Sequence, residues 1–226
     1  MAVKRAKTLT PAQYKKVVDV VRRNEHALRD EVALRLSFYA GLRAKEIAGL
    51  RWANNILDAS GAVRGEVHIT SDVGKRAVER VVPLDGETVK LLRRLRRARP
   101  EAEYVFYALH NNQRRTVPVK AESGAVLQSA DTDQVIRTVD ENYVEGSVSA
   151  NAVVQFFRRL YATAGMNGAT SHSGRRTFIT SRAQVANNHG CSLRDVQMMA
   201  GHKSLETTAA YIEPSKAQRS LVEAWA

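Results

Sequence analysis

The chain has 226 residues and a formal net charge of +12 at pH 7, because 35 lysines and arginines outnumber 23 aspartates and glutamates. A hydrophobic fraction of 44% excludes a disordered basic tail, and a single cysteine, Cys191, excludes a disulfide framework and a thiolate zinc site. No run of about 18 apolar residues indicates a membrane span, and no apolar stretch typical of a signal peptide follows the N-terminus. We therefore expect a cytoplasmic protein whose partner is a polyanion: DNA, RNA or an anionic membrane surface.

The N-terminal part of the sequence is typical of helices. Thr10 can cap a helix that begins at Pro11, and Gln13 completes a capping box. Two further helices are expected over residues 29–40 and 44–50.

Residues 62–84 change to the alternating pattern of a small sheet. After a turn around residues 71–74, Val78, Arg80 and Val82 alternate with the residues between them. This pattern predicts a β-hairpin.

Asp85 can cap the next helix, which is strongly basic. Two interpretations stay open for its basic side chains: a solvated surface and non-specific contact with phosphates. These side chains are Lys90, Arg93, Arg94, Arg96, Arg97 and Arg99.

The remainder of the chain is a long polar connection followed by helices. Residues 108–147 are expected to hold an extended connection with a strand over 117–119 and a short helix over 131–140. The later helices are expected from Ser149 to Gly165, over 173–187, from Ser192 to Gly201, from Ser204 through Tyr211, and from Pro214 onward. The sequence therefore predicts a mainly α fold with a small antiparallel β-sheet (α+β).

Four separated segments concentrate polar residues where core residues are expected: 41–47, 74–84, 171–178 and 201–211. Their arginines can bind a tetrahedral oxyanion through two parallel hydrogen bonds, and their histidines can shuttle protons near pH 7. A tyrosine can serve as a covalent nucleophile when cations and a base assist it. Together these groups suit metal-free phosphoryl transfer through a phosphotyrosine.

The same segments, in this order, resemble the catalytic domain of the tyrosine site-specific recombinases, which include the phage integrases and Xer-type recombinases. His172 and Arg175 match the family's His-x-x-Arg box, and His202 followed nine residues later by Tyr211 matches its nucleophile box. Lys75 lies seven residues before Val82, as the hairpin lysine does in Xer-like sequences. The resemblance extends from about Leu9 to Pro214 and implies the tyrosine recombinase catalytic-domain fold.

The resemblance implies a role for each matching residue. Arg43 and Arg175 would hold the non-bridging oxygens of the scissile phosphate. Tyr211 would attack the phosphorus, giving a 3′-phosphotyrosine and a free 5′-hydroxyl. Lys75 would be the general acid for the leaving 5′-oxygen, and His172 the general base toward the tyrosine.

Two further residues would support this chemistry. His202 would donate a hydrogen bond to the phosphate, and Glu46 would support the segment that carries Arg43. Because the covalent link stores the bond energy, neither ATP nor a metal ion is implied. The implied partner is double-stranded DNA, bound by a homo-tetramer that is monomeric when free.

The sequence departs from the family pattern in two ways. Typical members carry a helical core-binding domain before the catalytic domain, whereas here we expect only a basic arm, residues 1–9. This difference indicates either a natural minimal form or a chain cut to its catalytic domain. Gly174 stands where many members have leucine, and residues 108–147 are longer than usual. The tail, residues 214–226, is expected to be exchanged with a neighbouring subunit.

Two other functions remain open beside DNA strand transfer. One is a non-catalytic DNA-binding accessory protein on the same fold, and the other is nicking and closing of the type IB topoisomerase kind. An RNA-binding role lacks support because no aromatic-rich strand motif is present.

Overall fold

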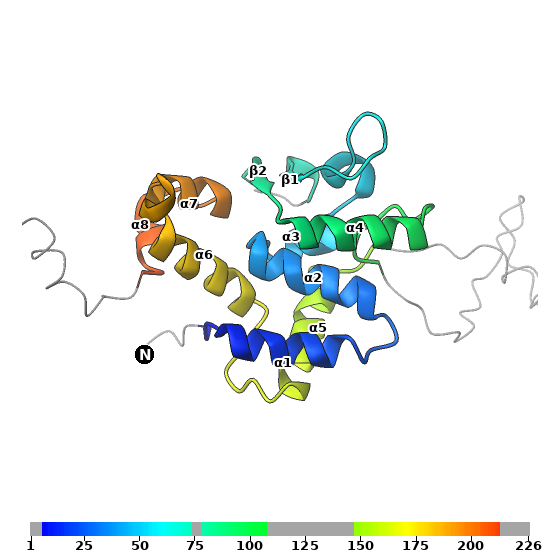
Figure 1. Cartoon of the computed structure of the whole chain (residues 1–226), viewed down its shortest axis with the longest axis horizontal. Coiled ribbons are helices and arrows are strands. Elements are labelled where there is room, and N and C mark those ends of the chain that lie inside the picture. The colour runs from blue at the N-terminus through cyan, green and yellow to red at the C-terminus, as the bar shows by residue number, and fades with distance from the viewer. Residues whose placement is uncertain (1–5, 74–77, 108–146, 213–226) are drawn as a thin grey trace, which may run out of the picture.

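A computed structural model describes residues 6–73, 78–107 and 147–212. The described chain is mostly helical with one two-stranded antiparallel sheet, which confirms the predicted fold class (Figure 1). The elements are α1 (Pro11–Val21), α2 (Ala27–Tyr39), α3 (Ala44–Gly49), a π-helical turn (Trp52–Ile56), β1 (Glu66–Ile69), a 3-10 turn (Ser71–Val73), β2 (Arg80–Pro83), α4 (Gly86–Ala98), α5 (Ala150–Thr163), α6 (Ser173–Val185), a second 3-10 turn (Asn187–His189), α7 (Leu193–Ala200) and α8 (Leu205–Ala209).

The side-chain caps that the sequence predicts at helix starts are confirmed, whereas the helix expected from residue 29 begins at Ala27 without such a cap. The hydroxyl of Thr10 accepts a hydrogen bond from the backbone N–H of Gln13 at 3.3 Å, and the Gln13 side chain accepts from the Thr10 N–H at 3.0 Å. Such bonds satisfy N–H groups that have no partner inside the helix. The later caps at Asp85, Ser149, Ser192 and Ser204 also form.

The sheet has the predicted alternation. Strands β1 and β2 pair antiparallel, with Val67 opposite Val82 and Ile69 opposite Arg80. The side chain of Val82 is fully buried and that of Arg80 is only 4% exposed, whereas Val81 between them is exposed. An arginine therefore lies on the inward face of β2, where alternation predicts an apolar residue.

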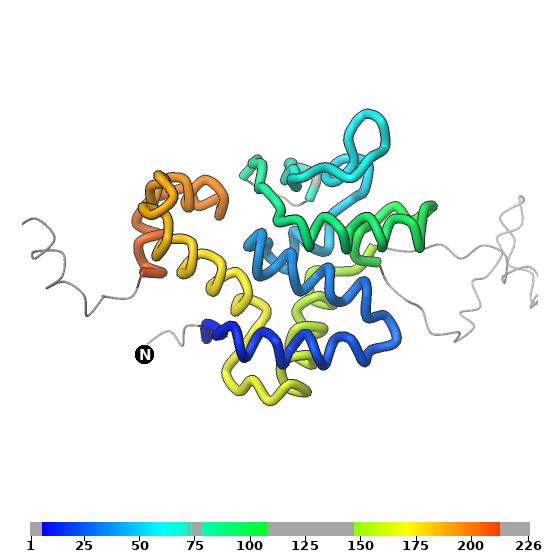
Figure 2. The backbone as a smooth tube through the Cα atoms, viewed as in Figure 1, coloured from blue at the N-terminus to red at the C-terminus, as the bar shows by residue number. Residues whose placement is uncertain are grey.

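Two hydrophobic clusters support the described elements. The larger cluster contains residues of the first five helices, α1 through α5, and of the sheet. Within it, α3 packs on α5, and α2 packs on α1 and α4; α2 also packs on α6. The smaller cluster is formed by Phe178, Ile179, Ala186, Val196 and Ala200 on α6, its C-terminal end and α7. In the tube view, α7 and α8 lie to one side of the larger body, and α6 connects them to it (Figure 2). None of the described helices has the length and apolar character needed to cross a bilayer.

Two glycines let helices α2 and α6 approach closely. Gly41 follows α2 with φ +64°, and a Cβ there would collide with the ring of Phe178 on α6. Gly174, in the first turn of α6, leaves no room for a Cβ, which would collide with the Ser37 hydroxyl and lie 2.8 Å from Cδ2 of Phe38. Contact with α2 therefore requires glycine at position 174, where many members of the resembled family have leucine.

One helix prediction is wrong and several others fall outside the described residues. Helix α8 ends at Ala209, so it does not contain Tyr211. The N–H groups of Tyr211 and Ile212 bond instead to carbonyls three residues earlier, because the last turn tightens beyond the helix. The π-helical turn was not predicted. The strand over 117–119, the helix over 131–140, the tail 214–226 and most of the basic arm lie outside the described residues.

Replacing Gly174 by alanine should destabilise the protein. The added Cβ must displace Ser37 or Phe38, and overpacking of this kind costs about 1–3 kcal/mol. Urea denaturation of Gly174→Ala measures this loss.

The matched control is Gly86→Ala at the start of α4, where a Cβ meets open space. That variant should be unchanged or more stable by up to about 1 kcal/mol, since alanine favours helix. Equal stability of the two variants would contradict the close contact between α2 and α6.

Candidate active site

Arg175 is the buried centre of the candidate site. Helix α6 carries it in its first turn, and the residue is only 3% exposed. Its guanidinium donates to the Gly41 carbonyl at 2.6 Å and to the Ala200 carbonyl at 2.6 Å. Burial, followed by the charge of Arg43, lowers the pKa of Arg175 to about 10, so it stays protonated at neutral pH. The two hydrogen bonds use two of the five N–H groups of the Arg175 guanidinium.

Arg43 lies beside Arg175 at the start of α3. Its side chain is 35% exposed, and it donates to Glu46 Oε1 at 2.8 Å and to the Gly201 carbonyl at 3.3 Å. The Arg43 backbone N–H donates to Glu46 Oε2 at 2.8 Å. The Glu46 carboxylate therefore orients Arg43, which remains accessible from solvent.

Three arginines bond to consecutive carbonyls at the end of α7. Arg80 Nε donates to Met199 at 2.8 Å, Arg175 to Ala200 and Arg43 to Gly201. The last carbonyls of a helix lack intrahelical partners and carry partial negative charge, so they attract cations. This helix end gathers guanidinium groups from three distant segments. The carbonyls belong to Met199, Ala200 and Gly201.

His202 follows this helix end and is positioned by α7 and α8. Its Nδ1 lies 2.9 Å from the hydroxyl of buried Thr208 on α8, and its carbonyl accepts from the Gln197 side chain at 2.9 Å. Burial, together with the charges of Arg175, Arg43 and Arg80, lowers the pKa of His202 to about 4. The ring is therefore neutral at pH 7, with one nitrogen able to donate.

Tyr211 lies against His202. The two rings stack with centroids 5.4 Å apart and an interplanar angle of 27°. The guanidinium of Arg176 lies 6.0 Å from the centre of the Tyr211 ring, and the Thr180 hydroxyl donates to the Tyr211 carbonyl at 3.2 Å. Tyr211 also packs on the smaller hydrophobic cluster, beyond the end of α8.

Five of the six predicted catalytic residues lie in the part of the chain that the structure describes. Arg43, Arg175, His202 and Tyr211 converge on the end of α7. His172 precedes α6, where its backbone N–H donates to the Thr170 hydroxyl at 3.2 Å and its side chain is exposed. It lies three residues before Arg175, on the same side of the first turn. Lys75, the sixth, lies outside the described residues.

Sequence reasoning did not assign a role to Arg80. The signal was an arginine at an inward position of an alternating strand, where burial requires a partner for its charge. The partner is Glu46, whose carboxylate accepts two hydrogen bonds from Arg80, at 3.0 and 2.8 Å. Burial tends to raise the pKa of Glu46, but hydrogen bonds and charge from Arg80, and then from Arg43, outweigh it and lower that pKa below its ordinary value.

The basic surface of α4 is divided between structural and exposed side chains. Arg96 donates to the Ala102 carbonyl at 2.9 Å and lies over the ring of Trp52, while Lys90 pairs with Glu87 at 2.7 Å. The phosphate-contact interpretation therefore applies best to the exposed arginines of this helix. These are Arg93, Arg94 and Arg97.

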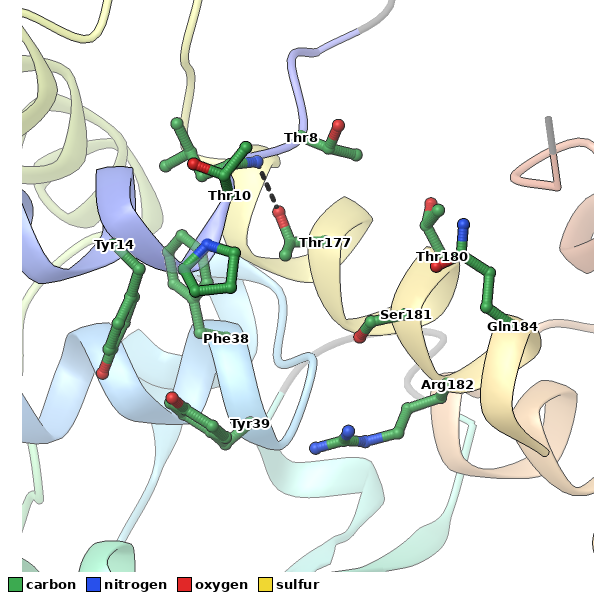
Figure 3. Close-up of a pocket in the computed structure, with 12 residues that line it drawn as sticks. Thr8, Thr10, Tyr14, Phe38, Tyr39, Thr177, Thr180, Ser181, Arg182 and Gln184 are labelled. Carbon is green, nitrogen blue, oxygen red and sulfur yellow. Dashed lines mark hydrogen bonds between the residues drawn. The ribbon is translucent and has the colours of Figure 1, made fainter. Parts of the chain in front are cut away.

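A pocket of about 630 Å³ lies between α1, α2 and α6, as Figure 3 shows. Tyr14 and Phe38 line it from α1 and α2, and Arg182 from α6. At its rim, the Leu9 N–H donates to the Thr177 hydroxyl at 3.0 Å. None of the five described catalytic candidates lines this pocket, so it is separate from the arginine site. Among the described residues, no three His, Cys, Asp or Glu side chains cluster so that they could hold a metal ion.

A sequence model of the phage integrase family matches residues 7–218. The chain belongs to this family. Tyrosine recombinase XerD of Xanthomonas axonopodis pv. citri is 33% identical over 187 residues, which cover 81% of this chain and 50% of that protein. Tyrosine recombinase XerC of Myxococcus xanthus is 25% identical over 187 residues, covering 82% and 50%. The chain thus spans about half the length of these curated relatives.

Solved structures show that the fold is that of tyrosine recombinase catalytic domains. XerA recombinase matches with a TM-score of 0.63 at 19% identity, over 96% of this chain and 64% of XerA. XerH recombinase bound to its difH substrate matches with a TM-score of 0.61 at 17% identity, over 100% and 56%. The predicted fold and family are therefore confirmed for this phage integrase family member.

The lowered pKa of His202 predicts a loss of stability in acid. Its ring titrates near pH 6.5 in the unfolded chain but at about 4 in the folded protein. Between these values the unfolded state binds more protons, so the free energy of unfolding falls as the pH drops from about 6.5 to about 4. Urea denaturation across this range should show a weaker pH dependence in His202→Gln than in the unsubstituted protein.

The control is His189→Gln, at an exposed position, which should keep the original pH dependence. A direct NMR titration of the His202 ring provides a second check. A ring that titrates near pH 6.5 would contradict the combined effect of burial and of the three arginines.

Proposed function

We propose that this chain is the catalytic domain of a site-specific DNA recombinase that cleaves and rejoins strands through a 3′-phosphotyrosine intermediate. The observation that carries the proposal is the convergence of Arg43 and Arg175 beside a neutral His202 that stacks on Tyr211. A scissile phosphodiester carries its negative charge on two non-bridging oxygens. Two guanidinium groups and a neutral imidazole N–H are suited to bind these oxygens and to stabilise the charge that grows in the transition state.

In the proposed reaction the Tyr211 hydroxyl oxygen attacks the phosphorus, and the bond from phosphorus to the 5′-oxygen breaks. His172 takes the proton of the tyrosine, and Lys75 supplies a proton to the leaving 5′-oxygen. The product is a 3′-phosphotyrosine with a free 5′-hydroxyl. Attack by the 5′-hydroxyl of another strand reverses these bond changes and joins the DNA. Phosphodiester bonds are exchanged one for one, so the scheme requires neither ATP nor a metal ion.

The proposed partner is duplex DNA, with four copies of the chain assembling on it. Among the structural neighbours, XerH is bound to difH substrate and λ integrase is bound as a dimer to a core site. The net charge of +12 favours association with a polyanion, mainly through phosphate contacts.

Covalent trapping tests the nucleophile. Nicked suicide duplexes that carry candidate sites should give an SDS-resistant protein–DNA adduct, without metal, from the unsubstituted chain and none from Tyr211→Phe. The matched control is Tyr104→Phe, which removes a hydroxyl bonded to Arg51 and should keep the adduct.

An adduct that persists in Tyr211→Phe would contradict the assignment of the nucleophile. Products joined between two duplexes would support recombination, whereas relaxation of supercoils without such products would favour topoisomerase-like activity. Salt-sensitive DNA binding with no adduct on any site would favour the accessory DNA-binding function.

Salt dependence tests the phosphate-binding role of Arg43. The logarithm of duplex affinity should fall linearly with the logarithm of salt concentration, and Arg43→Gln should reduce that slope by about 1 because one phosphate contact is lost. Fluorescence anisotropy with a labelled duplex measures both slopes.

Arg22→Gln is the control, because Arg22 is an exposed arginine paired with Glu31 on the α1–α2 side of the molecule. Its slope should match that of the unsubstituted chain. An unchanged slope for Arg43→Gln would contradict the proposed contact.

A further inference from the structure

Arg80 is a buried cation next to the candidate site, and its role differs from those of the exposed residues. Its side chain is 4% exposed on the inward face of β2. A group buried to this extent behind Glu46 is not placed to contact a phosphate that approaches from solvent. Apart from the field of its charge, its effect on a bound anion acts through the residues that it contacts.

The main contact of Arg80 is the Glu46 carboxylate. Arg80 donates to both carboxylate oxygens, at 3.0 Å to Oε1 and 2.8 Å to Oε2. Arg43 donates to the same two oxygens, through its side chain at 2.8 Å and its backbone N–H at 2.8 Å. Glu46 is itself 3% exposed, so solvent contributes little to its stabilisation. One buried carboxylate is thus shared by a buried and a partly exposed guanidinium.

The charge balance of this group determines how strongly Arg43 can attract an anion. Two guanidinium groups and one carboxylate leave a net single positive charge, directed outward through Arg43. Without the charge of Arg80, Glu46 and Arg43 would form a neutral pair. The buried carboxylate would then compete with the phosphate for the Arg43 hydrogen bonds, because a buried charge without a full set of partners is costly.

Other contacts keep Arg80 in this position. Its Nε donates to the Met199 carbonyl at 2.8 Å, and its Nη1 donates to the Val78 carbonyl at 3.2 Å. Gly201 packs against it so closely that a Cβ would lie 2.9 Å from Nη1. Arg80 therefore has little freedom to turn outward and bind the phosphate itself.

We propose that Arg80 is a positioning residue that neutralises Glu46 and so keeps the charge and hydrogen bonds of Arg43 available for a tetrahedral oxyanion. This inference rests on the proposed function, in which that oxyanion is the scissile phosphate. It adds Arg80 to the residues on which the reaction depends, although Arg80 does not touch the substrate.

Tungstate, a tetrahedral oxyanion, is the probe for the first experiment, because its binding requires no cleavage. Titration into the 15N-arginine-labelled chain should shift the Arg43 side-chain signal, which is assigned by its absence in Arg43→Gln. Arg80→Gln should weaken tungstate binding about tenfold, since Arg43 then neutralises Glu46. Arg80→Lys, which keeps the charge but not the double hydrogen bond, should weaken it by about threefold or less.

A double-mutant cycle separates this role from a structural one. When Glu46→Gln is added to Arg80→Gln, the competing carboxylate disappears, and binding should recover to within about threefold of Glu46→Gln alone. A purely structural role predicts instead that the double variant binds as weakly as Arg80→Gln or more weakly. If Arg80→Gln does not fold, the comparison between Glu46→Gln and the double variant still decides, because the proposal requires them to bind alike.

The matched control is Arg29→Gln, which breaks another buried ion pair, with Asp30 at 2.7 Å, away from the site. It should lower the denaturation midpoint but leave tungstate binding unchanged. The proposal is overturned if tungstate does not shift Arg43, if Arg80→Gln binds as tightly as the unsubstituted chain, or if the double variant fails to recover.

Adduct formation on suicide duplexes is the second measurement, and it should follow the same order among the variants. If the tungstate affinities of the variants are as expected but no variant forms an adduct, the result would count against the proposed recombinase function and uphold the role of Arg80. An adduct from the unsubstituted chain with no recovery in the double variant would overturn the role of Arg80 alone.

Discussion

The concentration of three guanidinium groups around one buried carboxylate is the constraint on which the site depends. Arg43, Arg80 and Arg175 repel one another, and burial removes much of the solvent that would screen them. Glu46 offsets one charge, and the carbonyls at the end of α7 accept a hydrogen bond from each arginine. The end of a helix and a single carboxylate thus make an otherwise unfavourable cluster of cations stable in the fold.

The same cluster explains the two glycines beside it. Gly41 and Gly201 both have φ near +60° and both end a helix, α2 and α7 respectively. Each also leaves no room for a side chain, at Gly41 because of Phe178 and at Gly201 because of Arg80. At both positions the glycine ends a helix and also allows close packing. This packing brings the carbonyls at the helix ends to the arginines. The lowering of the His202 pKa follows from burial and, after it, from the same cluster of positive charge.

The region that carries His202 and Tyr211 rests on the smaller hydrophobic cluster, whereas Arg43 and Glu46 belong to α3 beside the larger core. Five buried residues with a few partly buried neighbours provide less apolar burial than the main core does. Local stability follows the density of buried contacts, so we expect α7 and α8 to open more readily than α2 and α3. The two regions are connected at the end of α7, whose carbonyls accept hydrogen bonds from Arg43 beside α3, Arg80 on β2 and Arg175 on α6.

The sequence by itself determined the features that depend on neighbours along the chain. The capping box at Thr10, the caps at Ser149 and Ser192, the hairpin and the turn at Gly41 were predictable, because side chains there bond to backbone groups a few residues away. The order and spacing of the family motifs also identified the candidate catalytic residues.

Only the tertiary structure decided which of these residues meet and in what state. Arg175 bonds to a carbonyl 134 residues away, and Arg43 to one 158 residues away. The pairing of Arg80 with Glu46, the lowered pKa of His202 and the position of Tyr211 outside α8 also depend on such distant contacts. No local pattern encodes them, because the partners of a buried charge are chosen by how helices pack and not by their separation in sequence.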